Sequence, residues 1–270
     1  MKDCVYLRIA GGLGNQLFQY SYALACARSQ GRQLIINTYY QNHFIHPLAR
    51  ASAKRDFVLD KMGIIADDVL VVSRKEKTIL DKMLKLHGFR YRPIRSIAKK
   101  ILSVDFLDDY YCSARDFAYS QQIVNKIKTI YHERNRNERE NGEACFVHVR
   151  AGDLLNQPSN PKCSINYYKN AFDQMSKCSV RKYCIITESV EYAKTVLPKD
   201  KRWEIEFREP DTETNDFKQL TKAKYIISAN STFSWWAAML SECNVFISPP
   251  FFYRCGDKPA VQKNELIVNH

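Results

Sequence analysis

The first 37 residues constrain the fold class most strongly, because they alternate extended apolar segments with a helical one. Val5–Ala10 is a short apolar run that ends in Gly11-Gly12-Leu13-Gly14. Residues 15–28 then carry apolar side chains at helical spacing, and Gln33–Asn37 has the composition of a second strand. A strand, a glycine turn, a helix and a strand in this order predict the start of a parallel α/β unit.

The same alternation returns after a polar segment. Residues 132–143 carry no apolar periodicity, which makes them the best linker candidate. Beyond them we expect strands at 144–149, 182–187, 225–228 and 245–248, and helices at 167–177, 190–196, 217–223 and 233–241. The chain is therefore expected to form two α/β domains, residues 1–138 and 139–270, that face a cleft.

Three segments fall at the carboxyl ends of predicted strands, where open parallel sheets bind their ligands: residues 11–16, 148–153 and 230–236. The first segment opens a helix, whose free N–H groups and partial positive charge suit an anion. Leu17 stands where a dinucleotide fingerprint needs its third glycine, and the next strand ends in Asn37 instead of an acidic residue, which disfavours NAD. The alternative is a tight turn that needs only the conformational freedom of glycine.

The second segment, from His148 to Asp153, places a histidine, an arginine and an acidic residue at a strand end. Strand alternation puts His148 and Arg150 on one face. A guanidinium can fork two phosphate oxygens, so Arg150 is a candidate for holding a diphosphate and stabilising its charge as it leaves. The alternative is structural, with Arg150 in a salt bridge to Asp153 and His148 in the core.

The third segment runs from a strand into a helix. Asn230, Ser231 or Thr232 can cap this helix and also present hydroxyl and N–H groups to a phosphate. Plain capping and core packing are the alternative. The rings of Trp235-Trp236 can stack on a base or a sugar, although adjacent residues point different ways and at least one ring is expected in the core.

What the sequence lacks disfavours several classes of protein. It has no P-loop, no nucleophile elbow and no H-E-x-x-H motif, and the acidic pair Asp108-Asp109 resembles an exposed turn more than a metal site. Nine cysteines without a C-x-x-C pair favour reduced thiols in a cytoplasmic protein. The N-terminus lacks the features of a signal peptide, and the longest uncharged stretch, residues 225–241, is too short and polar to cross a bilayer.

Positive charge is concentrated in one segment. The formal net charge is +12, and residues 74–100 hold ten Lys or Arg against two acidic residues, with apolar residues at helical spacing. One interpretation is a solvated helix face. The other is a basic amphipathic helix drawn to anionic lipid or to a lipid-linked acceptor, which would place the protein at the inner face of the membrane. Nucleic-acid binding is not expected, because no nucleic-acid motif accompanies the charge.

Taken together, four stretches resemble the bacterial alpha-1,2-fucosyltransferases, glycosyltransferase family 11. They are IAGGLGNQLFQYSYALA, FLDDYYCSARDF, HVRAGD and ISANSTFSWWAAML, in family order over nearly the whole chain. Two departures stand out. Ala151 occupies the place of the second arginine in the family's H-x-R-R-x-D block, and Thr187-Glu188-Ser189 replaces an expected acidic S-D-D ending.

The resemblance implies a GT-B-like architecture of two Rossmann-like domains, with the acceptor on the N-terminal side and the donor on the C-terminal side. It implies an inverting transferase that moves L-fucose from GDP-fucose to the 2-hydroxyl of a galactoside, on an oligosaccharide or lipid-linked glycan of the bacterial surface, without a metal or other cofactor. By motif position, Arg150 binds the donor phosphates, and either Asp153 or His148 is the general base. The expected donor-binding residues are Arg150, His148, Asn230, Ser231, Thr232, Ser234, Gly12, Gly14, Asn15 and Gln16.

Two alternatives to this function remain at the level of sequence. The first is a related transferase that uses another nucleotide sugar. The second is a non-catalytic, basic, membrane-associated protein that keeps the fold.

Overall fold

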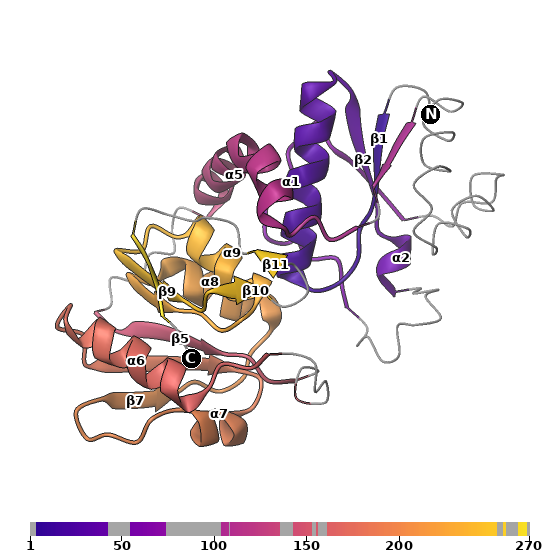
Figure 1. Cartoon of the computed structure of the whole chain (residues 1–270). Helices are drawn as coiled ribbons and strands as arrows, with labels where there is room; N and C mark the ends of the chain where they lie inside the picture. Colours follow the sequence, from indigo (N-terminus) through magenta and orange to yellow (C-terminus); the bar gives the residue numbers. More distant parts are fainter. Residues whose placement is uncertain are drawn as a thin grey trace. The chain divides into compact units, whose positions relative to one another are not determined.

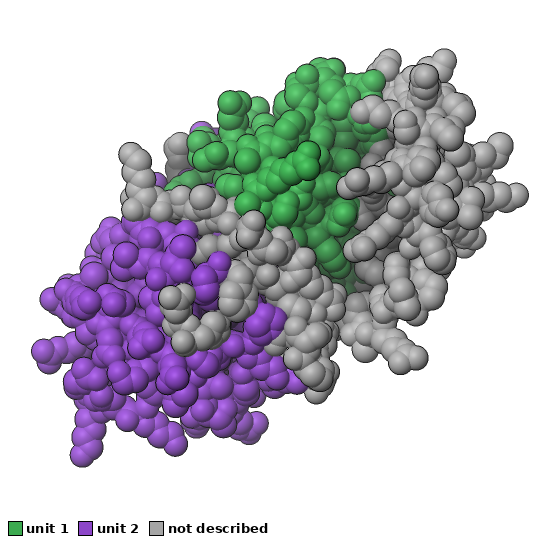
Figure 2. Space-filling view, in the orientation of Figure 1, with its two compact units in different colours: residues 1–130 green, residues 131–270 purple. Residues whose placement is uncertain are grey.

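A computed structural model describes residues 4–42, 55–73, 104–107, 109–135, 143–152, 155, 161–252, 256–257 and 264–268. The basic segment at 74–100, Asp108 and Asp153 lie outside the described residues. The chain divides into two compact units, residues 1–130 and residues 131–270 (Figure 1 and Figure 2). We call them unit 1 and unit 2.

Unit 1 is built on a four-stranded sheet in the order β3-β2-β1-β4, and every strand pair in it is parallel. Its first elements confirm the predicted strand, helix and strand. The bounds are β1 Cys4–Arg8, α1 Leu13–Ser29, β2 Gln33–Asn37, α2 Tyr39–Asn42, β3 Leu70–Val72, β4 Val104–Leu107 and α5 Ala114–Arg134. The short strands β3 and β4 were not predicted from the sequence.

Helix α5 continues into the segment that the sequence indicated as a linker. Its buried residues Val124, Ile127 and Tyr131 follow helical spacing. The Tyr131 hydroxyl also lies 2.8 Å from the Thr221 hydroxyl within unit 2. Apolar burial and this hydrogen bond keep the chain helical to Arg134, although the residues that follow are uniformly polar.

Unit 2 holds a six-stranded sheet in the order β12-β9-β8-β5-β6-β7, again with every pair parallel. All four predicted strands are present within one residue of their bounds, whereas β7 and β12 at the sheet edges were missed. The strands are β5 Cys145–Val149, β6 Lys182–Thr187, β7 Glu204–Phe207, β8 Tyr225–Ile227, β9 Val245–Ser248 and β12 Glu265–Ile267, and β10 Phe251–Phe252 pairs with β11 Gly256–Asp257.

Helices cover both faces of this sheet (Figure 1). They are α6 Ile165–Ser176, α7 Val190–Val196, α8 Glu213–Lys222 and α9 Thr232–Leu240. Val147 and Val149 of the central strand β5 belong to the core cluster that holds Phe172 of α6 and Ala193 of α7. On the other face, His148 packs against Phe233 of α9. Parallel sheets buried on both faces by helices confirm the predicted α/β class.

The cysteines correct one expectation. Cys4, Cys26, Cys145, Cys163, Cys178, Cys184 and Cys243 carry free thiols, as predicted. Cys112, however, is disulfide-bonded, so the expectation of reduced thiols throughout is wrong at this position. A disulfide depends on two sulfur atoms meeting in the fold, which cysteine spacing alone does not reveal. Within the described residues, no helix has the length and the apolar character needed to span a membrane.

Candidate functional site

The candidate site lies where three neighbouring strands of unit 2 end. Arg150 follows β5, Glu188 follows β6, and Ala229 and Asn230 follow β8. Since β6, β5 and β8 are adjacent and parallel, their carboxyl ends lie along one edge of the sheet. This is the edge at which ligands bind in open α/β sheets.

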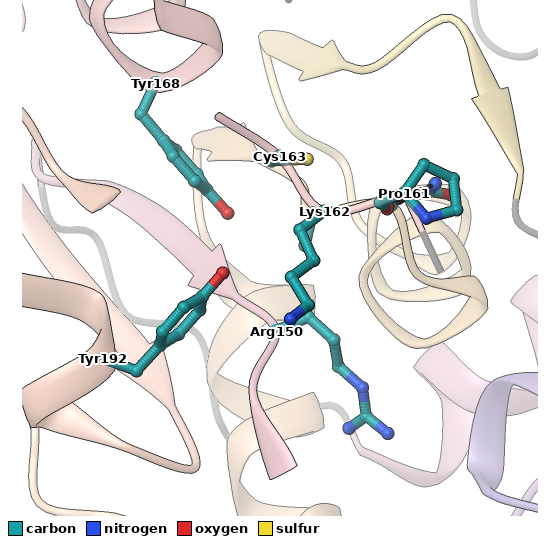
Figure 3. A pocket seen from close by; sticks show the side chains of 8 residues that line it. Arg150, Pro161, Lys162, Cys163, Tyr168 and Tyr192 are labelled. Carbon is teal, nitrogen blue, oxygen red and sulfur yellow. Dashed lines mark hydrogen bonds between the residues drawn. The ribbon is translucent and has the colours of Figure 1, made fainter. Parts of the chain in front are cut away.

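A hollow of about 270 Å³, counting the solvent at its mouth, opens at this edge (Figure 3). Figure 3 shows the hydroxyl groups of Tyr168 and Tyr192 pointing toward each other, with Lys162 opposite them and the guanidinium of Arg150 pointing away from the two tyrosines. The Arg150 side chain is 22% exposed, so it is neither sealed in the core nor fully in solvent. The hollow is lined by Arg150, Pro161, Lys162, Cys163, Tyr168, Tyr192, Ala229 and Asn230.

Arg150 forms an ion pair with Glu188. Its Nη1 donates to Glu188 Oε1, and the Ala151 N–H donates to the other carboxylate oxygen at 2.9 Å. Burial alone would raise the pKa of Glu188, but the Arg150 charge and the Ala151 N–H together hold that pKa below its ordinary value. Glu188 is therefore ionised at neutral pH and offsets the charge of Arg150. Asp153, the partner in the structural alternative, lies outside the described residues.

His148 is close enough to this ion pair to interact with both of its charges. It is 3% exposed, its ring lies 5.2 Å from the Phe233 ring between centroids, and its Nδ1 has no hydrogen-bond partner in the described structure. Burial lowers the pKa of His148 to about 4; the nearby Arg150 lowers it further, and Glu188 opposes the shift. The imidazole is therefore neutral at pH 7, and its Nδ1 is buried.

The segment before α9 combines capping with core packing. The Ser231 hydroxyl accepts from the Phe233 N–H at 3.3 Å, and the Asn230 side chain donates to the Pro161 carbonyl at 3.2 Å. Ser234 is fully buried and its hydroxyl has no hydrogen-bond partner in the described structure. Trp235 and Trp236 are both 0% exposed, so neither ring is placed to stack on a ligand and both belong to the core.

The glycine turn belongs to unit 1, whereas the residues above belong to unit 2. Gly11 has a φ of +86°, which favours glycine, and Gly12 is the N-cap of α1 without a side-chain cap. Gln16 is fully buried; its amide nitrogen donates to the Gly11 and Asp56 carbonyls at 2.9 and 2.8 Å, and its amide oxygen accepts from the Val58 N–H at 3.2 Å. These bonds give Gln16 a structural role. Donor contact by Gly12, Gly14, Asn15 and Gln16 stays a prediction.

The part of the chain that the structure describes shows no cluster of metal-ligating side chains. Among the described residues, no group of three or more His, Cys, Asp or Glu side chains is arranged to hold a metal ion. Asp109 accepts a hydrogen bond from the Tyr110 N–H at 2.7 Å, while the other half of that acidic pair lies outside the described residues. Metal independence therefore stays a prediction.

Comparison with known proteins decides the family. The chain matches the sequence model described as Glycosyl transferase family 11 over residues 4–247. It belongs to this family. This family 11 glycosyltransferase is 28% identical to an alpha-1,2-colitosyltransferase of Escherichia coli, over 93% of each chain. It is 25% identical to the O-antigen biosynthesis glycosyltransferase WbnK of Escherichia coli, over 97% of this chain and 99% of the relative.

A solved structure shares the fold. The Escherichia coli heptosyltransferase WaaC with ADP matches with a TM-score of 0.51 at 10% identity, over 98% of this chain and 92% of that chain. At this identity the likeness concerns the fold alone, and it supports the GT-B-like class expected from the sequence.

Two acidic residues of this family 11 glycosyltransferase were not selected as site residues from the sequence. Glu188 contacts Arg150 although the two residues are 38 positions apart, and the signal that could have revealed it is its place directly after the predicted strand 182–187. Asp216 lies on α8. Burial and the negative charges of Asp211 and Glu188 raise its pKa to about 6, while Arg208 opposes the shift.

Proposed function

We propose that this glycosyltransferase moves L-fucose from GDP-fucose to the 2-hydroxyl of a galactoside in a bacterial surface glycan. The observation that carries the proposal is the partly exposed side chain of Arg150, a residue that lines an open hollow at the carboxyl end of the central strand of unit 2. A diphosphate leaving group needs a cation at such a position, and a guanidinium can bind two of its oxygens at once.

The reaction is proposed as a single displacement that inverts the anomeric carbon. The acceptor hydroxyl oxygen forms the new bond to that carbon, the bond from the carbon to the diphosphate oxygen breaks, and GDP leaves with the electron pair. Arg150 and the N–H groups at the start of α9, next to Ser231 and Thr232, take up the charge that develops on the phosphate. In this proposal protein groups alone stabilise the leaving diphosphate, without a metal ion.

The hydroxyl proton needs an acceptor, and the environment of His148 argues against it. A base with a pKa of about 4 takes up a proton poorly at neutral pH, and the residue is only 3% exposed. We therefore propose that His148 contacts the donor through its buried nitrogen. Asp153, the other sequence candidate, is the proposed base.

Unit 2 is the proposed donor side, with His148, Arg150, Asn230, Ser231, Thr232 and Ser234 as its donor-binding residues, and unit 1 is the proposed acceptor side. Gln16 is proposed to act by holding the turn of unit 1, because its amide is already engaged with three backbone groups. The acceptor is proposed to be an oligosaccharide or a lipid-linked glycan.

A second donor has a specific observation in its favour. The relative that is 28% identical to this chain is named an alpha-1,2-colitosyltransferase, so transfer of colitose is the alternative. Both donors share the diphosphate chemistry proposed for Arg150. Side-by-side turnover of the two activated sugars separates them.

The proposal is tested with the purified chain, nucleotide-activated fucose or colitose, and a small panel of galactosides. We expect free GDP and a product with a new linkage at the 2-hydroxyl. A thermal shift with GDP gives an independent measure of donor binding, since a ligand that binds only the native state raises stability. The proposed function would be excluded if a folded protein showed no transfer and no GDP-dependent thermal shift.

The proposed contact with anionic membrane concerns residues 74–100 and is tested separately. A variant with the Lys and Arg residues of this segment neutralised should lose binding to anionic vesicles and keep transfer to a soluble galactoside. Unchanged vesicle binding would remove the membrane proposal and leave the transferase proposal intact.

A further inference from the structure

The charge balance of the hollow requires a second cation. A nucleoside diphosphate brings at least two negative charges to the site, and Arg150 is already paired with Glu188. Of the eight described residues that line the hollow, Arg150 and Lys162 carry a formal charge, and both are positive. Once the ion pair is counted as neutral, the positive charge left for an incoming anion is that of Lys162.

We infer that Lys162 is a second diphosphate-binding residue and supplies the charge that Ala151 lacks. The inference rests on the proposed function, because it assumes a nucleoside diphosphate in this hollow. Lys162 lies 12 positions after Arg150 and lines the same hollow, and in the view of Figure 3 its side chain ends near the start of the Arg150 side chain.

The present contact of Lys162 leaves it able to bind an anion. Its Nζ donates to the Leu155 carbonyl at 3.2 Å, in an exposed position. An ammonium group has three donors on a flexible stem, so it can turn toward a phosphate without breaking the core. A single neutral carbonyl is a weaker partner for an ammonium than a phosphate oxygen.

The position next to Arg150 brings no charge to the hollow in this chain. Ala151 is 0% exposed, and its N–H is bound to Glu188. Lys162 is exposed and lines the same hollow, so its ammonium group can bring that charge to the ligand.

Glu188 also explains how two cations share one small hollow. Arg150 and Lys162 would repel each other if both were unpaired, and the carboxylate of Glu188 on Arg150 reduces that repulsion. The three side chains together leave a net charge of +1 that faces the hollow.

The inference is tested by binding of GDP, GMP and guanosine to the full chain and to Lys162→Ala, by calorimetry at low ionic strength. If Lys162 binds the diphosphate, its loss should raise the Kd of GDP about tenfold, raise that of GMP less, and leave that of guanosine unchanged. Lys162→Arg should restore GDP binding to within about threefold of the parent. Lys177→Ala removes a matched exposed lysine of unit 2 whose Nζ contacts Gln174, and it should change none of the three affinities.

The outcomes separate this inference from the proposed function. Equal GDP affinity in the parent and in Lys162→Ala overturns the role of Lys162 while nucleotide binding stands. An equal loss for all three ligands means that Lys162 only holds the wall of the hollow, which also overturns it. Absence of GDP binding in the parent chain rejects the proposed function itself.

Discussion

Glu188 binds the guanidinium of Arg150 with one carboxylate oxygen and the backbone N–H of Ala151 with the other. The two residues follow adjacent parallel strands, whose register pairs Val149 with Thr187. Arg150 is therefore oriented before any donor arrives, and an incoming diphosphate has to share the guanidinium with a carboxylate or replace it. The ion pair thus makes Glu188 a competitor for the ligand of Arg150.

The first prediction concerns that competition. Glu188→Gln keeps an oxygen for the Ala151 N–H and removes the negative charge next to the anion site. Binding of inorganic pyrophosphate should tighten by about threefold to tenfold at low ionic strength, as measured by calorimetry. Glu206→Gln is the matched control, because Glu206 also pairs with a cation, Lys182, at 3.0 Å. Unchanged or weaker pyrophosphate binding in Glu188→Gln would show that Glu188 does not compete.

The second prediction is a pH dependence of stability that arises from His148. Its pKa of about 4 in the fold lies below the ordinary 6.5, so the fold favours the neutral ring. This stability is fully present above pH 6.5 and is lost as the pH falls toward 4, by an amount of about 3 kcal/mol. In urea unfolding at pH 7.5 and pH 4.5, His148→Gln should lose less stability than the parent between those two values. Equal losses in the two proteins would contradict the buried, neutral histidine.

The third prediction concerns Asp216, whose contribution to stability changes with pH in the opposite direction to that of His148. Its pKa of about 6 in the fold lies above the ordinary 3.8, so the fold disfavours the ionised carboxylate. The stability from its protonated form is complete below pH 3.8 and is lost as the pH rises through 6. Asp216→Asn should therefore raise the free energy of unfolding at pH 7.5 by about 1 kcal/mol, a value reduced for its partial exposure, and should have little effect at pH 4.

Asp200→Asn is the matched control for this measurement. The Arg202 side chain and its backbone N–H hold the pKa of Asp200 below its ordinary value, so its carboxylate is favoured in the fold. Its removal should bring no gain in stability at pH 7.5. A destabilised Asp216→Asn at that pH would mean that the carboxylate has a favourable partner.

The extent of sequence-based prediction differs between strands and contacts. Strands β5, β6, β8 and β9 were predicted because their apolar runs are buried on both faces, which leaves a strong signal. Strand β7, with the sequence Glu-Ile-Glu-Phe, lies at a sheet edge and is half exposed, so its pattern is weak. Edge strand β12 is missed for the same reason, since Leu266 and Ile267 are exposed.

In the candidate site, too, single residues could be predicted from the sequence but their contacts could not. Arg150 and His148 could be selected from the sequence because they end a buried strand and carry chemically useful groups. The partnership of Arg150 with Glu188 depends on which strand lies next to β5, and tertiary structure alone decides that neighbour. Likewise, nothing in residues 153–162 of the sequence indicates that Lys162 lines the same hollow as Arg150.

The fourth prediction separates a structural role of Gln16 from donor contact. Gln16→Met keeps the approximate shape and takes away the partner of the Val58 N–H, whereas the Gly11 and Asp56 carbonyls keep hydrogen bonds from the Gln41 amide at 2.6 and 3.2 Å. The free energy of unfolding should fall by about 1–3 kcal/mol, while the Kd of GDP in the folded protein stays unchanged. A loss of GDP affinity at unchanged stability would instead make Gln16 a donor contact, as the sequence resemblance implied.

The central claim is that the Arg150 guanidinium stabilises the leaving diphosphate, and removal of that side chain tests it most directly. The matched control is Arg202→Ala, which removes an exposed arginine paired with Asp173 and Asp200 in the same unit. The double variant R150A/E188Q separates loss of the cation from exposure of a carboxylate to the donor.

The measurement is kcat/KM for sugar transfer, with thermal unfolding to show that each variant is folded. Arg150→Ala should lower kcat/KM by about 10²- to 10³-fold. Arg150→Lys should lower kcat/KM less, because lysine keeps the positive charge although it cannot bind two phosphate oxygens at once. The double variant should keep a kcat/KM at least about tenfold below that of the parent. Arg202→Ala should transfer at the parental rate. Near-normal transfer by a folded Arg150→Ala would contradict the account.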